Sequence, residues 1–496
     1  MLGSNIFVKG LGFFYRVVLV RLLGVEGVGL VEMVSPVFSF LLVLGGCGIQ
    51  TSLSQIVAAK QGSESHIYFR TALMILAISS TLLTAAAYFA APWLVRQFAP
   101  DERILFCLQL ILPAIIIICL ASAFRGLFQG LKYVGAIGMS QNVEQITRVA
   151  VGIWLIGQMA VLALPEKVGA VSLATVCGEG IGFLYLLYVY FRGRKEYFLA
   201  PSRNHSFSFK AARELLALGL PLTASRLVST GIMMLQAILI PLCLKLGGWD
   251  IRAATEIYGR FAGVALALLH LPGVFTSALS VSVLPAVAES MTYDITGRRL
   301  MRQRINDSLQ AASSFTLLGM LLLFLFASPL CTLLFDNPPA AVILRILTIG
   351  GIFLYLQVTL ISVLQGLGEV KILLVNNIIC GVVLISGILL LTPLPSLGIS
   401  GAAIAVDISW LCGFCLNLYG VYRKAKIKLD WSNIALKPAA AALIVLLFYY
   451  SQQFFSPSLI ENQNMTTMLW QGIMVIAVYL LSLILSGGLI KIRRQK

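Results

Sequence analysis

The stretch from residue 104 to residue 124 reads ILFCLQLILPAIIIICLASAF and decides the fold class. It holds no charged residue, and a helix of this length spans about 30 Å, the hydrocarbon thickness of a bilayer. The rest of the chain is similar: 59% of its 496 residues are hydrophobic, 11% are charged, and the mean hydropathy is +0.93. A soluble domain carries about 25% charged residues. The composition therefore predicts an all-α polytopic membrane protein.

The chain contains fourteen apolar runs of spanning length, which predict fourteen transmembrane helices. The second, seventh and eighth runs are long enough to tilt or to protrude from the bilayer. The approximate ranges are 3–23, 28–58, 71–95, 104–127, 139–163, 168–191, 214–246, 255–289, 307–335, 341–365, 371–394, 397–422, 437–455 and 467–490.

The distribution of charge predicts the orientation. The chain has 36 Lys and Arg residues against 20 Asp and Glu, a net charge of +16. Most of the loop cations, with Arg125 counted among them, follow even-numbered runs or lie in the C-terminal tail, and cytoplasmic loops collect Lys and Arg. Both termini are therefore predicted to be cytoplasmic, and nucleic acid is not an expected partner. The loops after odd-numbered runs hold only Arg96, Arg103, Lys167, Lys245, Arg252 and Arg345.

Short internal matches suggest a duplication. Each match pairs a run with the run six places later, which predicts two parallel six-helix lobes related by an axis along the membrane normal. Such lobes commonly enclose a substrate site between them and work by alternating access. The matches are Phe128–Leu131 with Leu364–Leu367, Gly169–Ala170 with Gly401–Ala402, and Thr51–Ser54 with Ser277–Ser280.

The duplication predicts four parts. They are an N-terminal lobe at 1–192, a basic cytoplasmic linker at 193–213, a C-terminal lobe at 214–424, and two further helices with a basic tail at 425–496.

Ionisable residues inside the predicted spans are candidate functional groups, because charge at membrane depth usually faces a cavity or a partner. Lys9 and Arg16 share one helical face, and Arg21 is rotated away, near enough to the outer end to reach the interface. Arginine grips phosphate through a planar fork, so a cavity with an excess of arginine favours an anionic substrate. The candidate substrate-binding cations are Lys9, Arg16, Arg21, Arg226 and Arg260, and the candidate cavity or coupling residues are Glu32, Glu144, Arg148, Glu256 and Asp407.

Four of these residues form two pairs at the i,i+4 spacing, Glu144 with Arg148 and Glu256 with Arg260. In each pair the Glu is on the N-terminal side. Two interpretations of such a pair stay open. Its charges face a substrate cavity, or they neutralise each other and hold neighbouring helices together. Glu144 belongs to a polar cluster, 140–145, that is unusual in a span, and Glu179 is a further acidic residue at membrane depth.

Catalytic chemistry is not indicated. There is no phosphate-binding GxxxxGK[ST] and no GxSxG, and the histidines His66, His205 and His270 are scattered. The nine cysteines are irregularly spaced, and the isolated CxxC at Cys412 and Cys415 is better explained as small apolar filling than as a metal or redox site. No enzyme, cofactor or metal site is predicted.

Several motifs resemble the polysaccharide-exporter branch of the multidrug/oligosaccharidyl-lipid/polysaccharide exporter superfamily, and within it the stage V sporulation protein B group. The similarity covers nearly the whole chain. The residues that carry it are Leu11–Gly24, Phe124–Gly130, Ser140–Val149, Pro221–Arg226, Phe275–Ala286 and Leu364–Gly368.

The resemblance implies a flippase for an undecaprenyl-pyrophosphate-linked saccharide, with lipid II for peptidoglycan or spore cortex as the expected substrate, in the bacterial cytoplasmic membrane. Related MurJ-type flippases line a cavity with cations of helices 1, 2 and 8, which match Lys9, Arg16 and Arg21 in helix 1 and Arg260 in helix 8. The helix 2 arginine has no counterpart in Gly48–Thr51. In that group the last two helices form a groove for the lipid tail.

Three functions remain open. The first is a flippase whose partners are the lipid-linked oligosaccharide, membrane lipids and cell-wall synthesis enzymes. The second is a cation-coupled exporter of drugs or small molecules that uses Glu32, Glu144 or Asp407. The third is a scaffold that recruits envelope-synthesis enzymes through a basic cytoplasmic face.

Overall fold

The computed structural model describes residues 2–60, 64–159, 161–193, 208–273, 295–425, 429–455 and 465–487, with the single positions 276, 283, 287 and 289. The described residues form helices and connecting turns without a strand, and they divide into two compact units, Met1–Gly259 and Arg260–Lys496. The two units are defined by packing and divide the chain at residue 259, whereas the predicted lobes, 1–192 and 214–424, come from the internal sequence matches. The lobe boundaries therefore stay a prediction. Most of the predicted linker, the match at Ser277–Ser280 and the basic tail beyond residue 487 lie outside the described residues.

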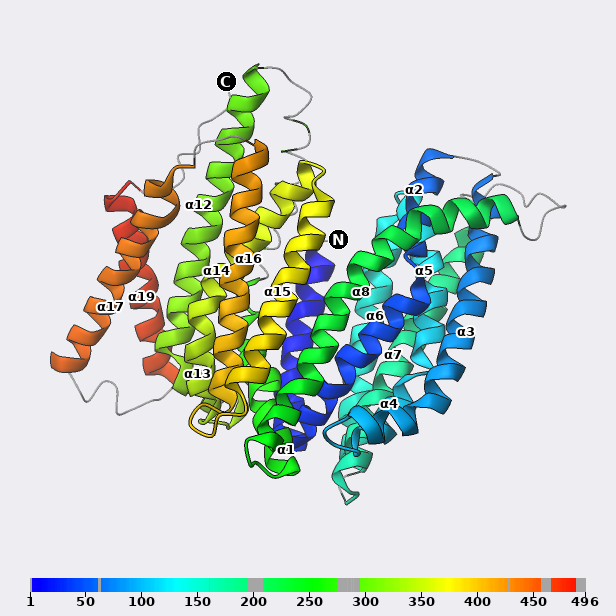
Figure 1. Ribbon diagram of the computed structural model, residues 1–496, viewed down its shortest axis with the longest axis horizontal. Helices are drawn as coiled ribbons and strands as arrows, with labels where there is room; N and C mark the ends of the chain where they lie inside the picture. The colour runs from blue at the N-terminus through cyan, green and yellow to red at the C-terminus, as the bar shows by residue number, and fades with distance from the viewer. Residues whose placement is uncertain are drawn as a thin grey trace. The chain divides into compact units, whose positions relative to one another are not determined.

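The predicted runs correspond closely to the helices (Figure 1). In unit 1 these are α1 (Leu2–Gly46), α2 (Ile49–Ala59), α3 (Glu64–Phe98), α4 (Ile104–Ile111), α5 (Ala114–Gly130), α6 (Val134–Gln158), α7 (Leu164–Gly193), α8 (Phe209–Leu246) and α9 (Ile251–Gly259). In unit 2 they are the π-helix η1 (Arg260–Ala265), α10 (Leu266–Leu269), α12 (Ile295–Leu325), α13 (Ala327–Phe335), α14 (Ala340–Gly366), α15 (Val370–Leu391), α16 (Ile399–Ala425), the π-helix η2 (Ser432–Leu436), α17 (Lys437–Phe455) and α19 (Met465–Leu485).

Among the described residues, eleven helical segments are long and apolar enough to cross a membrane. The first segment, Ile6–Ala59, contains the first two predicted runs. Two further runs are not among the eleven: α6 carries the polar cluster around Glu144, and the eighth run is described mainly over α9, η1 and α10. The prediction of an all-α polytopic membrane protein is confirmed.

Glycine, rather than a loop, separates the first two predicted runs. Helical geometry runs from Leu2 to Gly46 and is interrupted at Gly24, whose φ of 70° is easily reached only by glycine. Arg16 and Glu32 each lie eight residues from Gly24, which would put them about 24 Å apart along a straight helix. Their side chains instead meet at 2.6 Å, so the two arms of α1 fold back on each other at Gly24.

A second glycine breaks the second run. Gly48 adopts a left-handed conformation with φ 65°, and α2 begins directly after it without a side-chain cap. A Cβ at Gly48 would overlap the carbonyl oxygen of Gly219 in α8, and a Cβ at Gly219 would lie 2.5 Å from the carbonyl oxygen of Cys47. The backbones of α8 and of the α1–α2 junction therefore pack in direct contact, which only glycine permits.

The core of unit 2 has two apolar clusters. In the first, Leu360, Val363 and Leu364 of α14 pack with Ile305 of α12 and Val421 of α16. In the second, α17 and α19 lie side by side and cover α12 (Figure 1). There Val445 and Tyr479 are almost fully buried against Leu321 and Leu325, and the Tyr479 hydroxyl donates to the carbonyl oxygen of Ser314 at 3.0 Å.

Candidate functional site: charges at membrane depth

The first helix presents its three predicted cations differently. Lys9 and Arg21 are exposed, whereas the side chain of Arg16 is 34% exposed and forms an ion pair with Glu32, which is 17% exposed. Two candidate residues from the two arms of α1 are thus brought together by the fold at Gly24. The pairing offsets part of the positive charge of Arg16 and occupies the carboxylate of Glu32.

A cluster of four charges lies among α5, α6 and α7. The Glu144 carboxylate receives hydrogen bonds from Arg148 at 2.6 Å and from Arg125 at 3.0 Å. The Glu179 carboxylate receives one from Arg148 at 3.0 Å and lies 3.7 Å from Arg125. All four side chains are at most 24% exposed. We call Arg125, Glu144, Arg148 and Glu179 the charge quartet; it has no net charge.

Glycine explains how α7 approaches the charge quartet so closely. A Cβ at Gly178 would lie 2.9 Å from the carbonyl oxygen of Glu144, and a Cβ at Gly182 would lie 3.1 Å from the Glu144 Cβ. Gly178 directly precedes Glu179, and Gly182 follows it by three residues, which places Gly182 on the same face of α7. Small residues at this interface let the two acidic side chains reach the same two arginines.

The charge quartet corrects the predicted loop position of Arg125 and extends the predicted pair of Glu144 and Arg148. Arg125, which the loop analysis counted as a cytoplasmic loop cation, lies inside α5 with a side chain only 12% exposed. The predicted i,i+4 pair of Glu144 and Arg148 is present. Sequence analysis noted Glu179 as an intramembrane charge without giving it a partner, because its partners lie 31 and 54 positions earlier in the chain.

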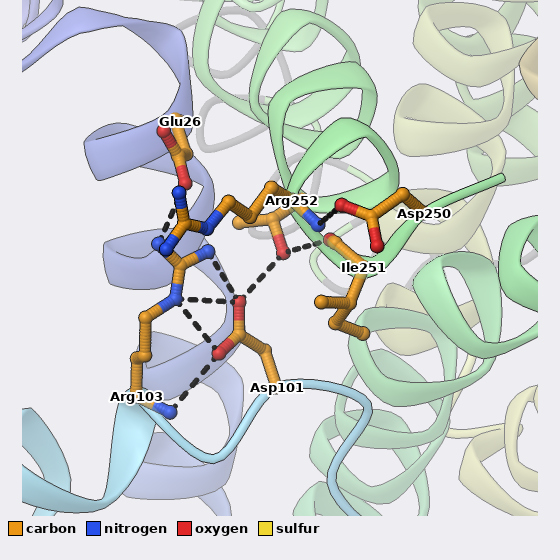
Figure 2. A network of polar contacts seen from close by, with 7 residues as sticks. Glu26, Asp101, Arg103, Asp250, Ile251 and Arg252 are labelled. Carbon is orange, nitrogen blue, oxygen red and sulfur yellow. Dashed lines mark hydrogen bonds and ion pairs between the residues drawn. The ribbon is translucent and has the colours of Figure 1, made fainter.

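A polar network joins α1, the segment between α3 and α4, and α9 (Figure 2). Arg103 donates to Glu26 at 2.6 Å and to Asp101 through Nη2 at 2.7 Å, with further bonds from its Nε and backbone N–H to Asp101. The Thr255 hydroxyl lies 2.9 Å from Oδ2 of Asp101 and 2.9 Å from the carbonyl oxygen of Ile251. We call Glu26, Asp101, Arg103 and Thr255 the α9 clamp.

The clamp sits on a close contact between helices. A Cβ at Gly29 would overlap the carbonyl oxygen of Thr255, and a Cβ at Gly259 would overlap that of Val25. The side chain of Asp101 is 3% exposed, and Thr255 is fully buried. Burial raises the pKa of the Asp101 carboxyl, but the hydrogen bonds and positive charge of Arg103 outweigh it and hold this pKa below its ordinary value.

The clamp was not predicted from the sequence. Arg103 was expected only as a loop cation on the side predicted to be extracytoplasmic, and Glu26, Asp101 and Thr255 had no predicted role. The available signal was local: Asp101 and Arg103 stand two residues apart directly before α4, a spacing at which an aspartate accepts from the following backbone N–H.

The break at Gly48 opens onto an open-sided cavity of about 160 Å³ within unit 1, lined by residues of α1, α2, α5 and α8. Arg226 is its one charged lining residue, with Gln50, Thr51, Ser122 and Thr223 as the polar ones. Of the predicted cations in unit 1, Arg226 thus lines a cavity; its side chain is exposed, and it forms no ion pair with any of the described residues.

In unit 2, Arg260 is the first residue of η1, directly after the clamped helix α9 that carries Glu256. Asp407 of α16 faces α14, and a Cβ at Gly350 would overlap its carboxylate. Its Oδ1 is buried and has no hydrogen-bond partner within the described chain. Asp407 therefore differs from Glu32 and Glu144, each of which has an arginine partner.

A second cavity, of about 240 Å³, lies in unit 2 among α12, α14, α16, η2 and α17. Its wall is almost entirely apolar and includes Leu309, Leu356, Phe414, Trp431 and Ala435. Trp431 and Ala435 lie just before the thirteenth predicted run, 437–455. The cavity suits an alkyl or prenyl chain rather than a polar headgroup.

Comparison with known proteins agrees with this architecture. Residues 1–291 match the family of polysaccharide biosynthesis proteins. Stage V sporulation protein B of Bacillus subtilis (strain 168) is 28% identical over 478 residues, which is 94% of this chain and 90% of the relative.

Two solved structures have the same fold. A lipid II flippase MurJ in an inward closed conformation matches with a TM-score of 0.75 and 17% identity, over 97% of this chain and 96% of its own. An inward-facing multidrug resistance MATE family transporter of the MOP superfamily matches with a TM-score of 0.68 and 16% identity, over 84% and 95%. With the family model covering more than half of its length, the chain belongs to the polysaccharide biosynthesis protein family and is a multi-pass membrane protein with the MurJ- and MATE-like fold.

Proposed function

We propose that this protein is a flippase that moves an undecaprenyl-pyrophosphate-linked saccharide, with lipid II as the specific candidate, across the bacterial cytoplasmic membrane. The observation that carries the proposal is the surplus of cations at membrane depth. The charge quartet is neutral by itself. Removing it from the count leaves Lys9, Arg16, Arg21, Arg226 and Arg260 against Glu32, Glu256 and Asp407. A positive surplus favours a phosphate-bearing substrate.

The apolar cavity of unit 2 supports the lipid half of the proposal. A prenyl chain needs an apolar path, and this cavity borders η2 and α17, where the resemblance to MurJ-type flippases implies a groove for the lipid tail. The similarity to proteins named for sporulation and for lipid II flipping supports a substrate of the cell-wall type.

Alternating access is the mechanism that we propose. The predicted lobes would rock about the substrate, which enters from the cytoplasmic side and leaves outside. The bias of loop cations supports cytoplasmic termini. Membrane lipids and the lipid-linked oligosaccharide are the proposed partners, and cell-wall synthesis enzymes are the proposed protein partners.

The test is transport by the purified full chain in proteoliposomes that contain a fluorescent lipid-linked saccharide. Wild type is expected to expose the headgroup to an external quencher or reductant, and the double variant Arg16→Ala/Arg260→Ala to abolish this at equal protein content. Arg213→Ala, an exposed arginine of α8 outside the cavity, is the matched control and is expected to transport normally. Normal transport by the double variant would remove the cation-grip proposal.

The second candidate is a cation-coupled exporter of the same fold, and the buried, unpaired Oδ1 of Asp407 favours it. A carboxylate that takes up a proton or a sodium ion needs a free oxygen, and both oxygens of Glu144 already accept hydrogen bonds from arginines. Ion-driven efflux of a dye from vesicles without any movement of a lipid-linked saccharide, abolished by Asp407→Asn, would establish this function in place of the first.

A further inference from the structure

We propose that the α9 clamp is the extracytoplasmic gate of the transport cycle, closed in this structure and opened when α9 moves away from Asp101 (Figure 2). The inference rests on the alternating access of the proposed function. It adds the place where the outer side of the protein closes, and it explains how a buried polar contact can part and form again in every cycle.

The clamp lies where an outer gate is needed. Glu26 stands between the first two predicted runs, Asp101 and Arg103 stand between the third and the fourth, and α9 begins after the loop that follows the seventh. Loops after odd-numbered runs are on the side predicted to be extracytoplasmic. The first three residues belong to the predicted N-terminal lobe, and Thr255 belongs to the predicted C-terminal lobe. Two lobes that alternate have to separate on this side once in each cycle.

The charges of the clamp all stay on one side of this contact. Arg103 binds Glu26 at 2.6 Å and Asp101 at 2.7 Å, and both carboxylates belong to the same predicted lobe as the arginine. Thr255 is the clamp's member from α9, and it is neutral. Separating a buried ion pair is costly, because each charge loses its partner. Within the clamp, movement of α9 breaks only the contact of a hydroxyl and leaves both ion pairs intact.

Each partner in the contact that breaks has a second partner of its own. The Thr255 hydroxyl lies 2.9 Å from Oδ2 of Asp101 and also 2.9 Å from the carbonyl oxygen of Ile251, one turn earlier in α9. Its single hydrogen can therefore stay with Ile251 when α9 moves. Asp101 keeps the bonds from Nε, Nη2 and the backbone N–H of Arg103. Opening is therefore cheap, because it leaves neither group without a hydrogen bond.

The helix contact behind the clamp is backbone against backbone. A Cβ at Gly29 of α1 would overlap the carbonyl oxygen of Thr255, and a Cβ at Gly259 of α9 would overlap that of Val25. Where glycine meets a carbonyl oxygen, no side chain has to change its rotamer when the helices part. The same close fit is regained when they return.

The chain provides a joint at the C-terminal end of α9. The α-helix ends at Gly259, and the π-helix η1 starts at Arg260. The boundary between the two compact units falls at the same place. Short π-helical segments are rare and are frequent at functional sites, since they interrupt the regular hydrogen bonding of a helix. A change of direction at this joint lets α9 swing away from α1 without unwinding.

The accessibility of position 255 tests the gate. Thr255→Cys places a thiol of similar size at a fully buried position, and a membrane-impermeant maleimide added to intact cells reaches it only when the gate opens. We expect labelling at least about ten-fold faster than at Thr348→Cys. Thr348 of α14 is the matched control, because it is 2% exposed, lies toward the end of α14 predicted to be extracytoplasmic, and donates to the carbonyl oxygen of Arg345 in its own helix. The unmodified chain, with its nine cysteines, gives the background.

A bound label is expected to hold the gate open. The maleimide adduct at position 255 keeps α9 from returning, so the purified, labelled Thr255→Cys protein should lose transport of a lipid-linked saccharide in proteoliposomes in proportion to its labelling. A second variant, Gly259→Ala in the Thr255→Cys chain, pushes α9 away from Val25 and should raise the labelling rate. Gly180→Ala, where a Cβ meets nothing within 4 Å, should leave that rate unchanged.

Two results overturn the gate and leave the flippase proposal standing. One is a Thr255→Cys protein that transports while its thiol stays as protected as that of Thr348→Cys, because α9 then never leaves its place. The other is undiminished transport by the fully labelled protein. Rapid labelling of Thr255→Cys, together with a wild-type protein that moves no lipid-linked saccharide, overturns the flippase proposal and keeps the gate for another substrate.

Discussion

The buried hydroxyl of Thr255 lies 2.9 Å from Oδ2 of Asp101, a residue 154 positions earlier in the chain. This bond links α9 to the segment before α4. Thr255→Val keeps the shape of the side chain and removes the donor, so Asp101 would lose one of the bonds that offset its burial. We expect a loss of about 1–2 kcal/mol in the free energy of unfolding, measured by thermal denaturation in detergent. Thr175→Val, which removes only a bond within α7, is the matched control and should cost less.

The clamp also predicts a pH dependence. Because the pKa of Asp101 is held below its ordinary value of 3.8 in the folded protein, its ionised form stabilises the fold. That contribution is fully present above the pKa of the unfolded chain and is lost as the pH falls through 3.8 and then through the lower folded pKa. Unfolding rates of Asp101→Asn should therefore depend less on pH than those of wild type below about pH 5. Parallel pH profiles of the two proteins would contradict the assignment.

The charge quartet allows a test of whether it serves structure or transport. Glu179→Gln leaves two arginines with one carboxylate in a largely buried place, and we expect a loss of about 3–5 kcal/mol in stability together with poor accumulation of protein. The double variant Glu179→Gln/Arg125→Gln restores neutrality and should recover part of that loss.

Transport per folded molecule decides the interpretation. If the quartet only holds α5, α6 and α7 together, the double variant will transport at the wild-type rate once protein amounts are equalised. A double variant that is stable but inactive would assign the quartet to the transport cycle.

The contact between α1 and α9 predicts a strong effect of a single methyl group. Gly259→Ala places a Cβ against the carbonyl oxygen of Val25, so the helices must separate and the clamp must stretch. We expect a markedly lower melting temperature. Gly180→Ala is the control, because a Cβ there meets nothing within 4 Å and the change should stabilise α7 by about 0.5–1 kcal/mol. Equal melting temperatures for the two variants would show that the contact carries no energy.

The apolar cavity of unit 2 can be filled from η2. Ala435→Leu adds volume inside the cavity, and we expect it to weaken binding of long polyprenyl pyrophosphates more than that of short ones. Ala440→Leu, an exposed position of α17 outside the cavity lining, should have no effect. A uniform loss for all chain lengths would indicate that the cavity does not contact the tail.

The sequence predicted the spans well and their interruptions poorly. Runs such as 341–365 and 371–394 coincide with the single helices α14 and α15 to within a few residues, because the bilayer imposes a length and an apolar composition that can be counted. The breaks at Gly24 and Gly48 could not be predicted, since a glycine takes its conformation from the neighbour that approaches it. For Gly48 that neighbour is Gly219, far along the chain.

The same distinction applies to the charged residues: a pair within one helix could be predicted from the sequence, and pairs between helices could not. The pair of Glu144 and Arg148 could be predicted because one helical turn brings the residues together. The partnerships of Arg125 with Glu179 and of Asp101 with Thr255 depend on which helices pack side by side, and local spacing carries no information about that. The placement of Arg226 in a cavity likewise required the fold, and its role as a phosphate ligand stays a prediction.

The charge quartet has a consequence for how the chain is made. α6 is too polar to qualify as a membrane-crossing helix by itself, and synthesis proceeds from the N-terminus. When α6 leaves the ribosome, Arg125 of α5 already exists, but Glu179 of α7 does not. Until then the nascent cluster of Arg125, Glu144 and Arg148 carries one uncompensated positive charge, which is costly in lipid. Stable insertion of α6 is therefore expected to depend on α7.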